Sequence, residues 1–460
     1  MQAATEEQID KTQANLSKLS EIQESVSGDE SELRAVKRML NGLSAVEIAN
    51  LLNSSPPKSR QYLWDLIDPD AHADIIQELP EEVAVQFVKE MDSQHVAELT
   101  ESIDVDDVAD ILQKLPGQIM QEVLEAMSAQ NRARVEMVLS YEEDTAGGLM
   151  DTDVITIRPR FTLDVVMRYL RRHEEIPPST DQLVVVNADN VYLGTLSMSK
   201  LLTTDPNISV REIMRTDLEA IPVDMDDGKV AQLFEQNDWI SAPVVNDLGQ
   251  VLGRVTIDDV VDVIIEDADH SLMGLSGLSE DEEDTFAPLF KSAPRRAIWL
   301  GINLITAILA SSVINIFQDT IDKIVALAIL MPIVASMGGV AGSQTLTVVV
   351  RGMALGKIGA SNRNWLLMRE ILSGLMNGLV WAGVLAALTA WWFNDIRIAI
   401  IIAVATIINL FTAAIGGTLL PPMLKRMGID PALAGGVALT TLTDVVGFMA
   451  FLGLATVFYA

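Results

Sequence analysis

Five long stretches of apolar residues occupy the C-terminal part of the chain. Each has the roughly 20 apolar residues that an α-helix needs to cross the hydrocarbon layer of a membrane. Shorter polar segments separate them, so the pattern predicts a transmembrane domain with five helices over 297–460. The expected spans are approximately 297–317, 324–350, 371–393, 398–424 and 432–459.

Residues 35–147 show a different pattern, a series of short amphipathic stretches. The segment at 74–80, Asp-Ile-Ile-Gln-Glu-Leu-Pro, recurs at 110–116 as Asp-Ile-Leu-Gln-Lys-Leu-Pro. A segment that recurs at such a spacing along the chain is typical of a helical solenoid, so we predict an α-helical N-terminal superhelix. The alternative is that two helices end in Leu-Pro by coincidence. Residues 1–34 form a polar N-terminal segment, and we expect no cleavable signal peptide.

Residues 148–268 alternate strand-sized apolar runs with helical stretches, which is typical of an α/β domain. The order occurs twice, and each copy closes with Gly-x-(Leu/Val)-(Ser/Thr) before a helix, at 194–197 and 253–256. These segments resemble a tandem pair of cystathionine-β-synthase (CBS) domains, at 150–204 and 208–268, followed by a connecting helix over 269–296. The predicted fold class is a multidomain membrane protein with an α-helical N-terminal superhelix, α/β tandem CBS domains and a five-helix transmembrane bundle.

Charge divides along the same boundary. The formal net charge is −32, but residues 1–290 hold 58 acids and 21 bases, whereas residues 291–460 hold 6 acids and 11 bases. A strongly acidic surface repels nucleic acid and attracts cations, so no nucleic-acid partner is expected. The absence of cysteine excludes disulfides, thiolate metal sites and cysteine nucleophiles.

Basic residues near the ends of the spans indicate the orientation, since Lys and Arg are retained on the cytoplasmic side. With the N-terminal domains in the cytosol, nine of these residues lie inside, and only Lys323 and Arg397 lie outside. We therefore expect a multi-pass protein of the inner (plasma) membrane whose N-terminal domains are cytosolic and whose C-terminus is on the outer face.

Asp444 is the one acid placed well inside a predicted span, ~20 Å along the last helix from Pro431. An ionised carboxylate at that depth costs at least ~2.5 kcal/mol, so a lone one is expected to face a water-filled path or a cation. Thr440 and Thr441 lie within about one turn and add hydroxyl groups. This set suits Mg²⁺, which keeps several waters when carboxylates bind it. The alternative is a protonated Asp444 that hydrogen-bonds a neighbouring helix.

The second span holds a glycine-rich segment after Pro332, which we interpret as a break in the helix. Accessible backbone carbonyls can serve an ion where such a segment lines a cavity. Small residues that allow close helix packing are the alternative. The predicted pore-lining residues are Gly338, Gly339, Ala341, Gly342, Ser343, Gln344, Thr440 and Thr441.

Three segments of the predicted transmembrane domain are Gly-Gly-x-Ala-Gly-Ser-Gln (338–344), Asp-Pro-Ala (430–432) and Thr-Leu-Thr-Asp-Val-x-Gly (441–447). They resemble the MgtE family of magnesium transporters. The order of the domains resembles that family as well, so the resemblance covers nearly the whole chain. The resemblance implies a homodimer in which the second and fifth spans form one pore with paired Asp444 carboxylates. Val340 departs from the family's frequent Asn, and Gly435-Gly436-Val437 departs from its Ser-(Gly/Asn)-Pro. Both departures lie beside the expected ion path and bear on selectivity.

The resemblance also implies that the CBS domains and the connecting plug helix bind Mg²⁺ through clustered acids and thereby close the pore. The matching regulatory acids are Asp226, Asp238, Asp259, Asp262 and Glu266. The last three share one helical face, where a cation held against the acidic run at 280–284 would relieve repulsion. Gly228 replaces one acid of the family pattern, and an ordinary solvated face is the alternative. Thr256-x-x-Asp259 resembles the ribose-binding signature of CBS domains, so ATP is a second expected ligand.

These observations predict a Mg²⁺-selective or Mg²⁺-preferring channel or transporter that cytosolic Mg²⁺ closes. The alternatives are a broader divalent transporter for Co²⁺, Mn²⁺ or Ni²⁺ and a CBS-gated anion channel, which would need cationic groups in its pore. A membrane sensor without transport would leave Asp444 unexplained. No nucleophile–base set indicates an enzyme, and no Walker-type loop indicates an ATP-driven pump.

Overall fold

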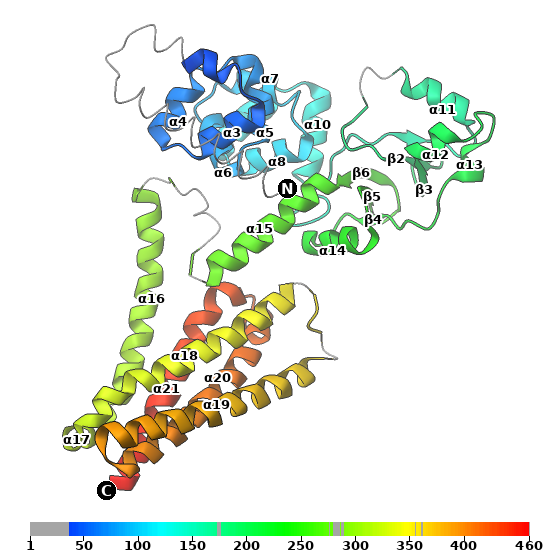
Figure 1. Ribbon diagram of the computed structural model, residues 1–460. Coiled ribbons are helices and arrows are strands. Elements are labelled where there is room, and N and C mark those ends of the chain that lie inside the picture. Colours follow the sequence, from blue (N-terminus) through cyan, green and yellow to red (C-terminus); the bar gives the residue numbers. More distant parts are fainter. Residues whose placement is uncertain are drawn as a thin grey trace, which may run out of the picture. The chain divides into compact units, whose positions relative to one another are not determined.

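A computed structural model describes residues 36–172, 176–275, 277–278, 286, 289–354, 356–359 and 362–459 (Figure 1). The predicted N-terminal segment 1–34 and the acidic run 280–284 lie outside these residues. Apart from a short connecting stretch, the chain divides into two compact units, one up to residue 265 and one from residue 266 onward.

The first unit begins with the predicted all-helical domain. Its helices are α3 (Ala45–Asn53), α4 (Pro57–Trp64), α5 (His72–Gln77), α6 (Glu81–Val88), α7 (Ser93–Leu99), α8 (Val105–Gln113), α9 (Gly117–Ala126) and α10 (Ala129–Val138), with a 3₁₀ turn at Pro69–Ala71. The sequence repeat corresponds to two helix–Leu-Pro–helix units, because Pro80 precedes α6 and Pro116 precedes α9. Proline lacks an N–H and therefore fits the start of a helix, where that donor would have no partner.

Two α/β repeats follow, as the CBS resemblance implied. The first contains β1 (Thr156–Ile157), α11 (Leu163–Leu170), β2 (Gln182–Val186), β3 (Tyr192–Ser197), α12 (Met198–Thr203) and α13 (Val210–Ile213). The second contains β4 (Ile221–Pro222), α14 (Asp227–Asn237), β5 (Ser241–Val245), β6 (Val251–Thr256) and α15 (Ile257–Leu275). In each three-stranded sheet the first strand pairs parallel and the last antiparallel to the central one. The repeated topology confirms the prediction of a tandem α/β pair.

The glycine of each repeated motif permits a close backbone approach. A Cβ on Gly194 would lie 2.1 Å from the carbonyl oxygen of Arg215, and a Cβ on Gly253 would lie 2.5 Å from that of Asp151. One hydrophobic core joins the second CBS repeat to the N-terminal helices, with members such as Leu112 and Val260. The second repeat and the helical domain therefore form one packed body.

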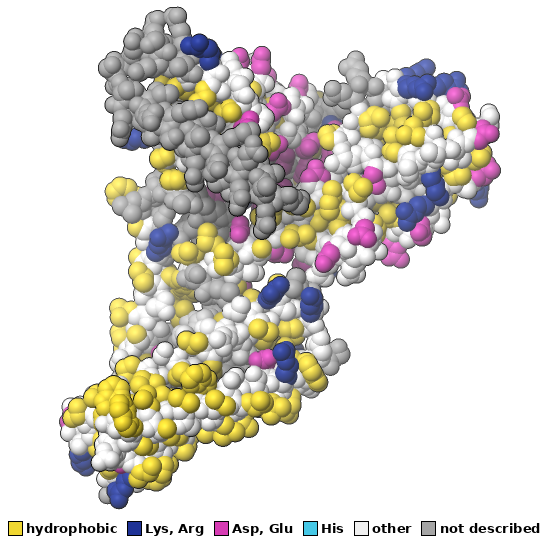
Figure 2. Space-filling view, viewed as in Figure 1, with side chains coloured by type: hydrophobic (Ala, Val, Ile, Leu, Met, Phe, Trp, Pro, Cys, Tyr) yellow, Lys and Arg dark blue, Asp and Glu magenta, His cyan; other side chains and the backbone are white. Residues whose placement is uncertain are grey.

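The second unit contains the helices of the predicted transmembrane bundle. These are α16 (Leu289–Ile316), α17 (Gln318–Lys323), α18 (Val325–Ala354), α19 (Arg363–Phe393), α20 (Ile396–Arg426) and α21 (Pro431–Tyr459). Within the described residues, five helices are long and apolar enough to cross a membrane, namely α16, α18, α19, α20 and α21. This number confirms the five predicted spans. Hydrophobic side chains cover their outer surface, whereas acidic side chains are scattered over the first unit (Figure 2).

The helix that contains the third predicted span begins before that span. The third span was expected to begin at 371, but α19 begins at Arg363 and therefore includes Glu370. Polar residues at the start of a long helix lower the local hydropathy without ending the helix, so hydropathy alone placed its start too late.

Candidate functional site

A groove in the second unit is formed by the second and last spans, α18 and α21. Its volume is about 810 Å³. It is lined by Ala335, Ser336, Gly339, Val340, Ser343, Gln344, Thr347, Val348, Thr440 and Asp444. The α18 residues recur at intervals of three and four, which places them on one helical face. The groove therefore brings together five of the predicted residues, namely Gly339, Ser343, Gln344, Thr440 and Asp444.

Asp444 lies near the middle of α21, and its side chain is partly buried. The hydroxyl of Thr440, one turn earlier, donates to the carbonyl oxygen of Gly436 at 3.0 Å. Its oxygen can therefore still accept a hydrogen bond. Ser343 and Gln344 are exposed on the α18 side of the groove. Waters bound to a cation donate hydrogen bonds, so a carboxylate surrounded by hydroxyl and amide oxygens suits a hydrated divalent cation.

The interpretation of the glycine-rich segment as a helix break was wrong. α18 continues as one helix through this segment. In a membrane, helical hydrogen bonding satisfies the backbone groups, and small residues let helices approach each other. A Cβ on Gly338 would lie 2.2 Å from Nδ2 of Asn409, and a Cβ on Gly342 would lie 2.9 Å from Cδ2 of Leu439. These two glycines therefore pack against neighbouring helices rather than line the groove.

Two further predicted pore residues lie off the groove lining. Ala341 is partly buried on α18, and Thr441 donates through its hydroxyl to the carbonyl oxygen of Val437 at 2.7 Å. The two departures from the family pattern differ in position, because Val340 lines the groove and Val437 does not.

Sequence reasoning missed two polar residues of the spans. The side chain of Glu370 on α19 is only 13% exposed. Its Oε2 lies 3.5 Å from Oγ1 of Thr345. Asn409 of α20 is fully buried, and its amide donates to the carbonyl oxygen of Val334 at 2.8 Å. A single asparagine in a long apolar run was the available signal for Asn409, since a polar side chain inside a membrane is costly.

A cluster of acids lies in the first unit where α8 faces the start of α15. Oδ2 of Asp259 accepts hydrogen bonds from the backbone nitrogen and the hydroxyl of Thr256, at 3.1 and 2.8 Å. Burial outweighs these bonds and, with repulsion from Asp258 and Asp107, raises the pKa of Asp259 to about 7. Burial, then Asp258 and Glu78, also raise the pKa of Asp262.

The opposing acids on α8 were not predicted. Burial raises the pKa of Asp107 to about 6, with repulsion from Asp104 and from the α15 acids, even though Gln77 donates to it. Asp106 is buried, and its Oδ1 has no hydrogen-bond partner among the described residues. Burial and the charge of Asp259 raise the pKa of Asp106 as well. Adjacent acids on an amphipathic helix were the available signal, but only packing against α15 distinguishes them from a solvated pair.

Asp110, one turn further along α8, lies in an equally unfavourable setting. Burial, with repulsion from Glu81 and Glu143, raises its pKa to about 8. The ionised forms of all these carboxyl groups are therefore disfavoured in this arrangement. Protonation or a bound cation would relieve that cost.

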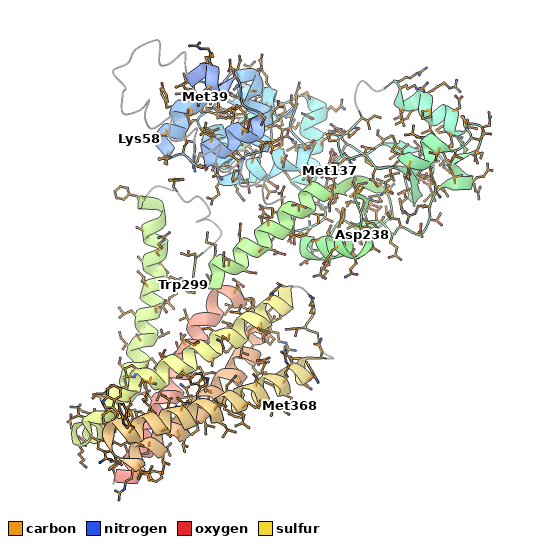
Figure 3. The ribbon with its side chains drawn as sticks, viewed as in Figure 1. Met39, Lys58, Met137, Asp238, Trp299 and Met368 are labelled. Atoms are coloured by element: carbon orange, nitrogen blue, oxygen red, sulfur yellow. The ribbon has the colours of Figure 1, made fainter. Side chains whose placement is uncertain are left out.

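The remaining predicted regulatory acids lie elsewhere. Asp226 precedes α14 and accepts a hydrogen bond from the backbone nitrogen of Lys229. Asp238, which Figure 3 labels, ends the same helix. Its backbone is in a left-handed conformation. The 11-residue helix separates them by ~18 Å. Glu266 belongs to the second unit. Among the residues that the structure describes, no three of His, Asp or Glu are arranged to hold one metal ion.

Comparison with known families agrees with this architecture. The sequence model named MgtE, described as a divalent cation transporter, matches residues 331–454. The MgtE intracellular N domain matches 43–144, and the CBS domain matches 146–206 and 210–266. The magnesium transporter MgtE of Enterococcus faecalis is 30% identical over 429 residues, which span 93% of this chain and 94% of the relative. The chain belongs to the MgtE family of divalent cation transporters.

Other MgtE proteins are similarly related. The magnesium transporter MgtE of Thermus thermophilus is 31% identical over 330 residues, which span 70% of this chain and 72% of that protein. A solved structure of the cytosolic domain of the Mg²⁺ channel MgtE in complex with ATP is 28% identical, with a TM-score of 0.38. The match covers 50% of this chain and 99% of the chain in that structure. The relatives confirm the predicted family, and the five long apolar helices of the second unit fit a multi-pass membrane protein.

In this MgtE-family chain, the two residues predicted to bind nucleotide already bond to each other. Thr256 and Asp259 form the hydrogen bonds described above, and the Thr256 hydroxyl also bonds to Asp258. Such bonds satisfy backbone donors at the start of α15. The bonds to Asp259 use only its Oδ2, so its carboxylate keeps acceptor capacity for a ribose hydroxyl.

Proposed function

We propose that this MgtE-family protein conducts Mg²⁺ through the groove that contains Asp444. The observation that carries the proposal is the position of this acid, half-way along an apolar span, in a groove lined by Thr440, Ser343 and Gln344. A hydrated Mg²⁺ gains charge attraction from the carboxylate while its waters bond to the neighbouring oxygens. The inner membrane, with the N-terminal domains in the cytosol, is the proposed location.

The pore is proposed to form between two copies of the chain. Val340 and Val348 of the groove are 57% and 52% exposed. A groove open on one side leaves an ion next to lipid, whereas a second copy would enclose it between two Asp444 carboxylates. A symmetric pair of chains is the common form of such an assembly.

Mg²⁺ flux into liposomes from purified Asp444→Asn and Asp444→Ala proteins tests the proposed ion site. We expect flux to fall at least tenfold, with unchanged yield and elution volume. Asp319→Asn is the matched control, because Asp319 lies in the short α17 outside the spans. Near-normal flux through well-folded Asp444→Ala protein would refute the ion site. Offering Co²⁺, Mn²⁺ and Ni²⁺ separately distinguishes a Mg²⁺-preferring path from a broad divalent one.

Regulation by cytosolic Mg²⁺ is the second part of the proposal. The crowded acids of α8 and α15 supply oxygen ligands of the kind that Mg²⁺ prefers. Their pKa values are raised first by burial and then by repulsion from neighbouring acids, and a bound cation would relieve that repulsion. A tenfold preference for the closed form contributes only ~1.4 kcal/mol per ion. Several weak sites that act together are therefore required. ATP is proposed as a further ligand of the second CBS repeat, at Thr256 and Asp259.

Neutralising both α15 acids, Asp259→Asn with Asp262→Asn, tests the regulatory site. We expect flux that persists at millimolar internal Mg²⁺, where the unaltered protein closes. Asp189→Asn with Asp247→Asn is the matched control, since both are exposed acids of the CBS repeats. If the protein with Asp259→Asn and Asp262→Asn closes at the same internal Mg²⁺ concentration as the unaltered protein, the sensor lies elsewhere.

A further inference from the structure

Asn409 occupies the centre of the helical bundle behind the ion groove. It lies on α20, which packs against α18, α19 and α21 (Figure 1). Its side chain is fully buried, and Nδ2 donates to the carbonyl oxygen of Val334 on α18 at 2.8 Å. Its Oδ1 has no hydrogen-bond partner among the described residues. An amide held in a membrane bundle with one side unsatisfied is costly, and such residues are characteristically functional.

Two glycines on the groove-forming helices make room for this amide. A Cβ on Gly338 of α18 would lie 2.2 Å from Nδ2, and a Cβ on Gly447 of α21 would lie 2.7 Å from the same atom. Both distances are shorter than any ordinary contact, so the amide is wedged against the backbones of both helices. Any larger residue at either position would force the asparagine or a helix to move.

These contacts lie next to the groove residues along both helices. Gly338 immediately precedes Gly339, which lines the groove, and Gly447 follows Asp444 by three residues. The Asn409 amide therefore bonds to α18 and lies against α21, within one turn of Asp444 along that helix. A leucine would occupy a similar volume, yet it could not bond across to α18.

We propose that Asn409 is a positioning residue for ion passage: it sets the spacing of α18 and α21 and thereby the affinity and selectivity of the Asp444 site. This inference rests on the proposed role of Asp444. A residue that only stabilises the bundle would change protein yield and thermal stability. A positioning residue would also change the Mg²⁺ concentration for half-maximal flux and the ratio of Mg²⁺ to Co²⁺ flux.

Asn409→Leu in full-length protein in liposomes is the first test. We expect the half-saturating Mg²⁺ concentration to rise roughly three- to tenfold, the range that one interhelical hydrogen bond in a membrane bundle supports. We also expect the Mg²⁺ to Co²⁺ flux ratio to fall. Thr406→Val is the matched control, because Thr406 is equally buried one turn away and its hydroxyl donates only to Ile402 of its own helix, at 2.7 Å. Unaltered values in a folded Asn409→Leu protein would overturn the inference.

Gly447→Ala provides a second test if Asn409→Leu does not fold. The added methyl group displaces the amide while Asn409 itself is retained, so the same rise in half-saturating Mg²⁺ is expected. Gly383→Ala on α19 is its control, since a Cβ there would meet no atom within 4 Å. Gly447→Ala protein with unaltered affinity and selectivity would overturn the inference. Asp444→Asn separates the two proposals: if it retains flux, the ion site fails, whereas if it loses flux while both positioning variants behave normally, only the role of Asn409 fails.

Discussion

Nε2 of His270 lies 3.2 Å from Oδ2 of Asp430, at the start of the helix that carries Asp444. The Asp430 carboxylate also accepts hydrogen bonds from the backbone nitrogens of Ala432 and Leu433, at 2.9 and 3.0 Å. His270 belongs to α15, so the C-terminal part of α15 contacts the first turn of α21 within the second unit. A movement of the C-terminal part of α15 would therefore act directly on α21, a helix of the proposed pore.

His270→Ala should weaken closure of the pore by internal Mg²⁺. Both side chains are about one-third exposed, so their contact contributes at most ~1 kcal/mol, and the Mg²⁺ concentration for half-closure should rise by at most about 5-fold. Flux into liposomes with graded internal Mg²⁺ measures this change. Leu272→Ala, an exposed residue of the same helix, is the control. If His270→Ala and Leu272→Ala close at the same concentration, the contact does not transmit closure.

The stability of the first unit should fall as pH rises. Unfolded aspartates titrate near pH 3.9. In the folded chain, burial and repulsion raise the pKa of Asp107 to about 6, of Asp259 to about 7 and of Asp110 to about 8. Between about pH 4 and 8 the folded form therefore binds more protons than the unfolded form, and the free energy of unfolding decreases with pH. Melting of the full-length protein without Mg²⁺ should show its first transition at lower temperature at pH 8 than at pH 6.

Mg²⁺ should reverse this pH effect, because it binds the ionised carboxylates. We expect added Mg²⁺ to raise the transition temperature more at pH 8 than at pH 6, with K⁺ of equal ionic strength as the control. Asp107→Asn with Asp259→Asn should reduce both the pH slope and the Mg²⁺ response. An equal Mg²⁺ shift at the two pH values would mean that these carboxylates do not bind the ion.

Val340→Asn should increase discrimination between Mg²⁺ and Co²⁺. Val340 lines the groove, so an amide there adds a hydrogen-bonding group for the waters of Mg²⁺. The ratio of Mg²⁺ to Co²⁺ flux measured in liposomes should rise severalfold. Val437→Ala is the control, because Val437 lies off the groove lining, and proline there would disrupt the interior of α21. An unchanged ratio in Val340→Asn would show that position 340 does not set selectivity.

The chain lacks cysteine, so single cysteines can test the proposed two-chain pore without a modified background. Val348→Cys in the groove should give covalent dimers in membranes treated with a short thiol-reactive cross-linker. Met376→Cys, which is 62% exposed on α19, should remain monomeric under the same treatment. Equal cross-linking at both positions would argue against an interface at the groove.

The sequence by itself determined the order of the domains, the five spans and the prominence of Asp444. Each depends on local properties: hydropathy over about 20 residues decides whether a helix crosses a membrane, alternation decides strand or helix, and a lone acid in an apolar run is conspicuous wherever its neighbours lie. The repeat at 74–80 and 110–116 likewise needed only the sequence.

The tertiary structure alone decided which residues meet. Gly338 and Gly339 are adjacent in the chain, but the 100° turn between successive helical residues places Gly338 against Asn409 and Gly339 in the groove. Asp107 and Asp259 are 152 positions apart, and only the packing of α8 on α15 makes them repel. Asp226 and Asp238 are close in sequence but are held apart by the rigid length of α14. Burial and through-space charge depend on such packing, which local sequence patterns do not encode.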